Sequence, residues 1–100
     1  MQLKKYRWSR DYESSEEELT QIFATKNITA ERWHGLEHQD YALHSHDYDT
    51  RIWCAEGSIK FEIGDKRFSL QPGDTLDLPA NTAHSATAGL SGCVCYEQQL

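Results

Sequence analysis

Apolar and polar residues alternate along most of the chain after residue 30, in short runs that predict β-strands. The runs TRIWCA (50–55) and IKFEI (59–63) each place every second side chain on the same face. A last strand is predicted over 93–96. Turn signals separate the runs, at Gly64-Asp65, Pro72-Gly73-Asp74 and Pro79-Ala80-Asn81. Short strands with a turn roughly every ten residues predict a β-sandwich or β-barrel.

A helical pattern precedes these strands. In SSEEELTQIFATKN an apolar stripe has i, i+3, i+4 spacing, formed by Leu19, Ile22 and Phe23. Ser14 or Ser15 is a suitable N-cap, and Asn27 is a suitable end. We therefore expect a short helix on the outside of a β domain, with LKKYRW (3–8) as a candidate strand before it. The predicted organisation is one domain, in which residues 1–30 form a strand-and-helix extension and residues 31–100 the barrel.

Charge and composition narrow the classes of partner. The 100 residues carry a net charge of −6 and a pI near 5.2, which disfavours nucleic acid and a basic membrane-binding face. No apolar run approaches the length that spans a bilayer, and the N-terminal residues lack the pattern of a signal peptide. A cytoplasmic protein is expected on these grounds. The odd cysteine count then favours reduced thiols, at Cys54, Cys93 and Cys95.

Three histidines carry the candidate chemistry. His44 and His46 are one residue apart, so a strand would place both on one face. His84 follows the third turn, at the start of a later strand, and a small barrel could bring all three imidazoles together. Neutral imidazole suits Zn, Fe, Cu, Ni and, less selectively, Mn. Three protein ligands would leave coordination positions open for water or a ligand.

The order and spacing of these residues resemble the two motifs of small, single-domain bacterial cupins. The first motif matches through His44, His46 and Gly57, and the second through Gly73, Pro79 and His84. The resemblance covers about residues 38–97. It implies an all-β double-stranded β-helix, the cupin or jelly-roll barrel, with a divalent transition metal held by the three histidines. It does not distinguish Fe, Mn, Ni and Zn. Small cupins commonly associate, so a homodimer is expected.

The main departure from the cupin pattern is at Thr50. The family has a glutamate four residues after the second histidine, and this chain has threonine there. A threonine hydroxyl is neutral near pH 7 and is a poor ligand. A shell of three neutral imidazoles would leave the charge of the ion uncompensated and favour a small anionic or chelating ligand. Smaller departures are His38 for the glycine that opens the first motif, Asn81 for a glycine of the second, and Ala88 for its final asparagine.

Other residues near the motifs are candidates for the pocket. Asp49 and Asp47 have the opposite strand parity to the histidine pair, so we expect them to point outward or lie in a bend. His38 is an alternative extra ligand or rim group, although a solvated loop position is the simpler expectation for it. Acid or hydrogen-bond-donor roles are open to three tyrosines, Tyr41, Tyr48 and Tyr96.

The sequence leaves the function open between classes. One hypothesis is a metal-dependent cupin enzyme, a dioxygenase or an isomerase-like activity on a small molecule. Another is a metal-free, non-catalytic cupin that binds a small ligand or a partner, and a structural role ranks last. Trp53 has outward parity and should be covered, either by the N-terminal segment or by another subunit.

Overall fold

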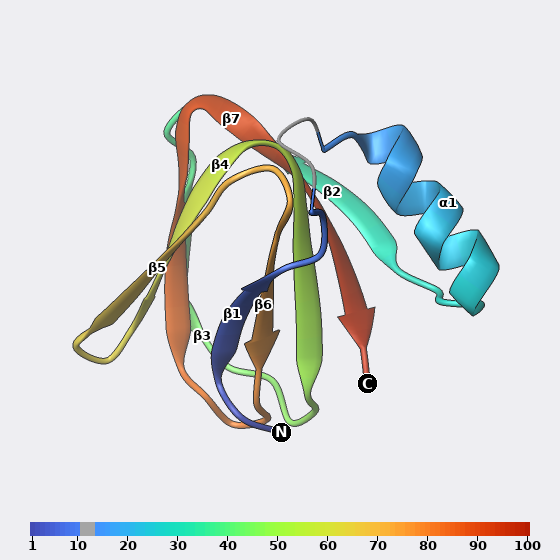
Figure 1. Ribbon diagram of the computed structural model, residues 1–100. Helices are drawn as coiled ribbons and strands as arrows, with labels where there is room; N and C mark the ends of the chain where they lie inside the picture. Colours follow the sequence, from blue (N-terminus) through green and yellow to red (C-terminus); the bar gives the residue numbers. More distant parts are fainter. Residues whose placement is uncertain (11–13) are drawn as a thin grey trace.

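The computed structural model describes residues 1–10 and 14–100, so residues 11–13 of the predicted N-terminal extension lie outside the described part. Seven strands and one helix occur within these described residues (Figure 1). Their order is β1 (Lys4–Arg7), α1 (Glu16–Lys26), β2 (Glu31–Gly35), β3 (Asp40–His44), β4 (Thr50–Ile63), β5 (Lys66–Leu70), β6 (Asp74–Leu78) and β7 (His84–Gln99).

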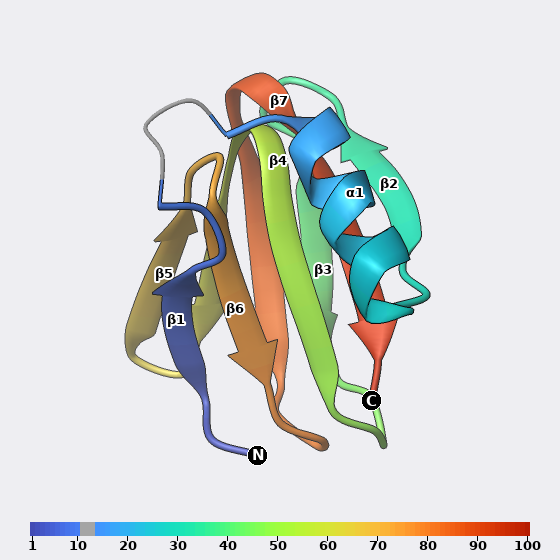
Figure 2. The same ribbon diagram turned by 45° about the vertical axis from the view of Figure 1, so that its right-hand side comes forward.

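Two long antiparallel strands, β4 and β7, form the centre of the fold. They pair with each other from Thr50–Gln99 at one end to Glu62–Ser85 at the other. The first half of β4 also pairs with β6 and the second half with β5, while β7 pairs first with β3 and then with β2. β1 adds to the outer edge of β6. The sheet therefore curls over on itself into the predicted all-β double-stranded β-helix (Figures 1 and 2).

Glycine makes the bend in both long strands possible. Gly57 of β4 and Gly92 of β7 have positive φ, of 68° and 72°. A Cβ on Gly57 would lie 2.1 Å from the carbonyl oxygen of Gly92, so the backbones meet where a side chain cannot fit. The pairing register of β4 with β7 shifts on both sides of Gly57. The predicted strands over 50–55 and 59–63 are consequently one bent strand, and the predicted strand over 93–96 is part of the second half of β7.

The barrel interior is filled by the apolar faces of the strands. The buried core includes Ile52, Ile59, Phe61, Leu70, Leu76 and Leu78 together with the three cysteines. Cys54, Cys93 and Cys95 are buried free thiols. They pack in this core as small side chains, and their free state agrees with the reduced thiols that the odd cysteine count predicts.

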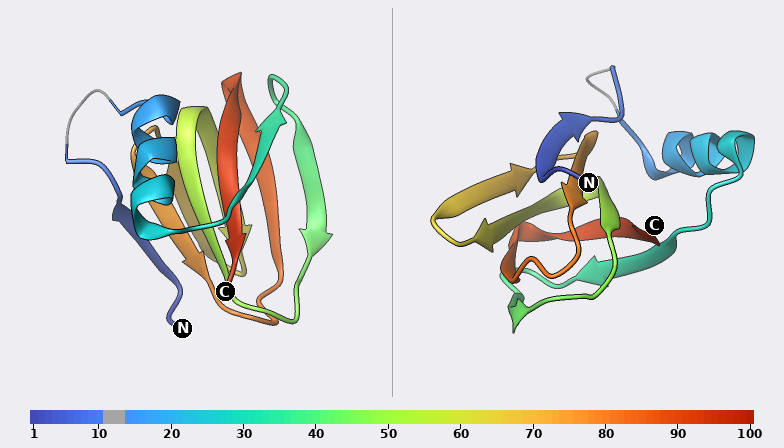
Figure 3. Two further views of the ribbon diagram at one scale, coloured as in Figure 1. Left: turned by 90° about the vertical axis from the view of Figure 1, so that its right-hand side faces the viewer. Right: turned by 90° about the horizontal axis from the view of Figure 1, so that it is seen from below.

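Helix α1 lies outside the strands, as predicted (Figures 2 and 3). Ser15 is the N-cap, its side chain accepting from the backbone N–H of Glu18, and Asn27 ends the helix in the left-handed conformation. Phe23 packs edge-on against Trp53, with ring centroids 4.8 Å apart. The N-terminal segment thus covers Trp53, which is 5% exposed. No helix among the described residues is long and apolar enough to cross a membrane.

Candidate metal centre

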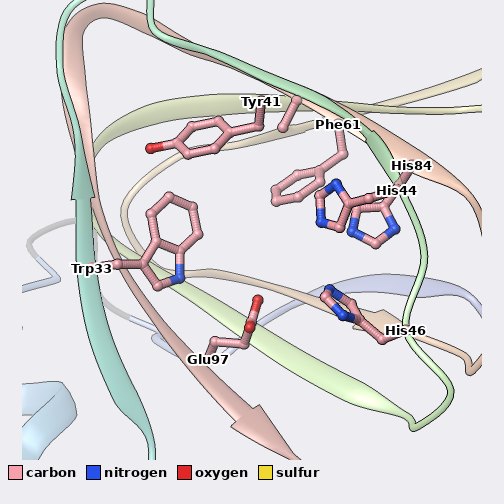
Figure 4. Close-up of a pocket in the computed structure, with 8 residues that line it drawn as sticks. Trp33, Tyr41, His44, His46, Phe61, His84 and Glu97 are labelled. Carbon is pink, nitrogen blue, oxygen red and sulfur yellow. The ribbon is translucent and has the colours of Figure 1, made fainter.

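The three predicted histidines meet at the end of the barrel where β3 ends and β7 begins. His44 ends β3 and His84 begins β7, and these two residues are paired in the sheet. His46 follows in the loop between β3 and β4. One ring nitrogen of each histidine lies within 4.8 Å of the others (Figure 4). The His44 and His84 rings are nearest, with centroids 4.2 Å apart.

Backbone carbonyl groups fix the tautomer of two of these rings. His44 Nδ1 lies 2.7 Å from the carbonyl oxygen of Ala42, and His84 Nδ1 lies 2.9 Å from that of Thr82. Because a carbonyl oxygen only accepts, each Nδ1 carries the proton and donates it. In the neutral form of each ring, Nε2 then keeps its lone pair, which is the state that a metal requires. The third ring is stacked on Tyr48, whose hydroxyl lies 3.4 Å from His46 Nδ1.

The three rings differ in exposure. His84 is buried at 3% exposure, His46 is partly buried, and His44 is exposed. Burial lowers the pKa of His84, the carbonyl group of Thr82 opposes that shift, and the two neighbouring imidazoles lower the pKa further. The buried ring is therefore neutral near pH 7, which is the form that coordinates metal.

A cavity of about 210 Å³ opens beside the histidines. Its walls are mainly aromatic and apolar, and the described residues that line it are Trp33, Tyr41, His44, His46, Phe61, His84, Ala86 and Glu97 (Figure 4). Trp33 and Tyr41 pack edge-on, with ring centroids 5.4 Å apart. Phe61 lies 6.3 Å from the His84 ring, centroid to centroid. The site thus combines a cluster of nitrogen ligands at one end with an apolar chamber.

Glu97 is a cavity residue that the sequence analysis missed. It lies opposite Ile52 in the pairing of β7 with β4, so its side chain shares the inner face with that core residue. Burial raises the pKa of the Glu97 carboxyl; His46 and His44 oppose this shift, and Glu31 adds to it. The sequence contained a signal for this position, because Cys93, Cys95 and Glu97 are two residues apart along one strand and therefore project from the same face.

Thr50 is buried but does not line this cavity. It is 1% exposed, at the start of β4 between Leu78 and Gln99, and shares the parity of the core residue Ile52. Its Oγ1 has no hydrogen-bond partner within the described part of the chain.

The remaining predicted candidates lie at different places in the fold, and only some of them line the cavity. Asp49 accepts from the backbone N–H of Ala80 at 2.8 Å, which ties the loop before β4 to the loop before β7. Tyr41 lines the cavity, whereas Tyr96 lies under α1 and donates to Glu16. His38 is exposed, has a φ of 57° and does not belong to the histidine cluster. Its positive φ lies in the left-handed region that favours glycine, the residue that the cupin motif has at this position.

Comparison with known proteins places this geometry in context. Residues 27–97 match the family described as the AraC-like ligand binding domain. A stretch of 43 residues is 42% identical to quercetin 2,3-dioxygenase of Bacillus subtilis (strain 168); the match covers 42% of this chain and 13% of that protein.

Solved structures agree with the fold. A DUF861 family protein from Thermotoga maritima superposes with a TM-score of 0.70 at 15% identity, over 99% of this chain and 100% of the other. A cupin superfamily protein from Desulfitobacterium hafniense has a TM-score of 0.66 at 15% identity, over 99% of this chain and 77% of its own. At these identities the structures establish the fold alone. They show that the chain has the cupin fold, and the match over residues 27–97 shows that it belongs to the AraC-like ligand binding domain family.

Proposed function

We propose that the chain is a small-ligand-binding cupin whose three histidines hold a divalent transition metal at one end of the cavity. The observation that carries the proposal is the convergence of His44, His46 and His84, with two of the rings held by backbone carbonyl groups in the metal-binding tautomer. A bound ion would supply a Lewis acid with open coordination positions. The chain itself would orient the ligand between the aromatic walls.

The donor set fits such an ion after a modest movement. Two nitrogens on one tetrahedral zinc ion, each at about 2.0–2.1 Å, lie about 3.3 Å apart. The nitrogens here lie within 4.8 Å of one another, so the rings need to close by up to about 1.5 Å. His44 is exposed and His46 lies in a loop, so both side chains have the freedom to close on the buried His84.

The cavity limits the size of the ligand. Its volume of about 210 Å³ lies below the roughly 300–1,000 Å³ typical of pockets for drug-sized molecules. The aromatic walls of Trp33, Tyr41 and Phe61 favour a ligand with a flat or apolar body. We therefore propose a small molecule with an apolar portion and one polar end directed at the histidines.

Metal analysis of protein purified without a histidine tag tests the metal site. We expect close to one equivalent of a transition metal after incubation with Fe(II), Mn, Ni or Zn. Less than about a tenth of an equivalent with every one of these metals would exclude the proposal. His84→Ala should lose the metal while keeping its far-UV circular dichroism. His34→Ala removes an exposed imidazole outside the cavity and should keep the metal, as the matched control.

A metal-free ligand-binding domain is the second candidate. It is favoured by Thr50 at the position of the usual glutamate and by the match to a family described by ligand binding. In that case thermal-shift screening of metal-free protein against small molecules would give hits that His84→Ala does not abolish. Hits that appear only in metal-loaded protein would favour the first proposal.

A further inference from the structure

Glu97 lines the same cavity as the histidine cluster. Figure 4 shows its carboxylate pointing from β7 into the space between Trp33 and His46. No other carboxylate lines this cavity in the part of the chain that the structure describes. The nearby charged or titratable groups that act on it are His46 and His44, from the β3 side, and Glu31 of the adjacent strand β2.

The position of Glu97 is costly for a carboxylate unless a positive charge comes near it. The side chain is partly buried, and no ion pair or hydrogen bond to its carboxylate is found in the described residues. Holding a carboxylate away from water without a partner is unfavourable. Glu31, its cross-strand neighbour, adds negative charge rather than compensating it. A divalent ion on the three histidines would provide the missing positive charge.

Glu97 is not one of the clustered ligands. The cluster whose ligand atoms lie within 4.8 Å of one another contains the three histidines and does not include Glu97. The carboxylate therefore lines the cavity beside the cluster and is not one of its three ligands.

We infer that Glu97 supplies, from β7, the negative charge that Thr50 does not supply from β4, and that it selects ligands carrying a hydrogen-bond donor over anionic ligands without one. The inference rests on the proposed metal site. A carboxylate accepts a hydrogen bond from a hydroxyl group and repels a second carboxylate. The sequence predicted an anionic ligand because a shell of three neutral imidazoles leaves the charge of the ion uncompensated. The carboxylate of Glu97 would add a negative charge beside that shell. The ligand class becomes small hydroxylated aromatic molecules.

Metal affinity provides the first test and does not depend on any catalytic activity. Zn²⁺ binding is measured by calorimetry for the wild type, Glu97→Gln, Glu97→Asp and Glu31→Gln. Glu97→Gln preserves the shape and removes the charge, and should weaken binding about tenfold. Glu97→Asp keeps the charge and should stay within about threefold of the wild type. Glu31→Gln removes the neighbouring charge outside the cavity and should change the affinity by less than about twofold.

Ligand selection provides the second test. Catechol, which donates hydrogen bonds, and benzoate, which is an anion without a donor, are titrated into Zn²⁺-loaded protein. Relative to the wild type, Glu97→Gln should bind benzoate about five- to tenfold more tightly and catechol more weakly. Glu31→Gln should change neither affinity.

The outcomes separate this inference from the proposed function. If the wild type binds Zn²⁺ and His84→Ala does not, but Glu97→Gln matches the wild type with Zn²⁺ and both ligands, the inference about Glu97 is overturned and the metal site stands. Equal losses in Glu97→Gln and Glu31→Gln would overturn it too, because the effect would then be general acidity. A wild type that binds no metal overturns both.

Discussion

Replacing Thr50 with valine should stabilise the protein. The side chain is 1% exposed and its Oγ1 has no hydrogen-bond partner among the described residues. Valine has nearly the same shape, so the substitution leaves the packing against Leu78 and Gln99 intact. It removes a buried hydroxyl whose desolvation costs about 1–3 kcal/mol. The strand position also suits valine.

We expect a gain of about 1–2 kcal/mol in the free energy of unfolding, measured by urea denaturation of the metal-free protein. In a domain of this size that gain corresponds to roughly 5–10 °C in Tm. Thr75→Val is the matched control, because Thr75 is 0% exposed and its Oγ1 is likewise without a partner. Both variants should gain stability, and neither should change the affinity for Zn²⁺.

Two results would refute this reasoning in different ways. A loss of stability above about 0.5 kcal/mol in Thr50→Val would mean that the hydroxyl is hydrogen-bonded in solution. A drop in Zn²⁺ affinity in Thr50→Val, but not in Thr75→Val, would instead mean that the Thr50 hydroxyl takes part in the metal site. In that case Thr50 would retain part of the role of the glutamate that the cupin pattern has at this position.

Three further predictions concern the frame around the site. Leu19→Ala should cost about 3 kcal/mol in the free energy of unfolding, since Leu19 lies on the buried face of α1 and is 0% exposed. A loss below about 1 kcal/mol in urea unfolding would mean that α1 is not docked in solution. His38→Gly should gain about 0.5–1 kcal/mol in the free energy of unfolding in the same assay, because the φ of 57° strains histidine. His38→Ala keeps that strain and is the control, so an equal gain in His38→Ala would rule out the backbone explanation. The third concerns Tyr6, where burial and the hydrogen bond to Asp77 raise the pKa of the phenol from 10.0 to about 12. Because the raised pKa belongs to the folded state, its contribution is complete below pH 10 and is lost as the pH rises toward 12. After solvent screening the contribution is about 1 kcal/mol. The free energy of unfolding should therefore fall more steeply between pH 10 and 12 in the wild type than in Tyr6→Phe. Parallel plots of unfolding free energy against pH for the two proteins would contradict this prediction.

The sequence predicted the parts of the fold that depend on local pattern. Strand alternation, turn residues and the helix caps are short-range signals, and Ser15 and Asn27 lie at the ends of α1 as expected. The outward parity of Trp53 correctly indicated a covered face. The spacing of the cupin motifs brought His84 to the histidine pair although 38 residues separate it from His46 (84 − 46).

Long-range geometry was harder to predict. Gly57 and Gly92 interrupt the alternation, so two continuous strands looked like shorter ones in the sequence. The strand pairing that turns Glu97 toward the histidines lies in the register of β4 with β7, which no local pattern encodes. Acids near the histidine pair in the sequence, such as Asp49, do not replace the missing carboxylate, and Asp49 instead accepts a hydrogen bond from the loop before β7.

The wall of the barrel also separates the tryptophans of the chain into two optical environments. Trp33 faces the cavity, while Trp53 and Trp8 belong to the apolar cluster beneath α1. A single strand, β4, separates the barrel interior from the cluster beneath α1. Ile52 and Trp53 are neighbours on this strand, so their side chains project from its opposite faces. Fluorescence from Trp33 therefore reports on occupation of the cavity, and emission from the other two indoles reports on helix docking. Single Trp→Phe substitutions would resolve ligand binding and helix docking within one unlabelled polypeptide.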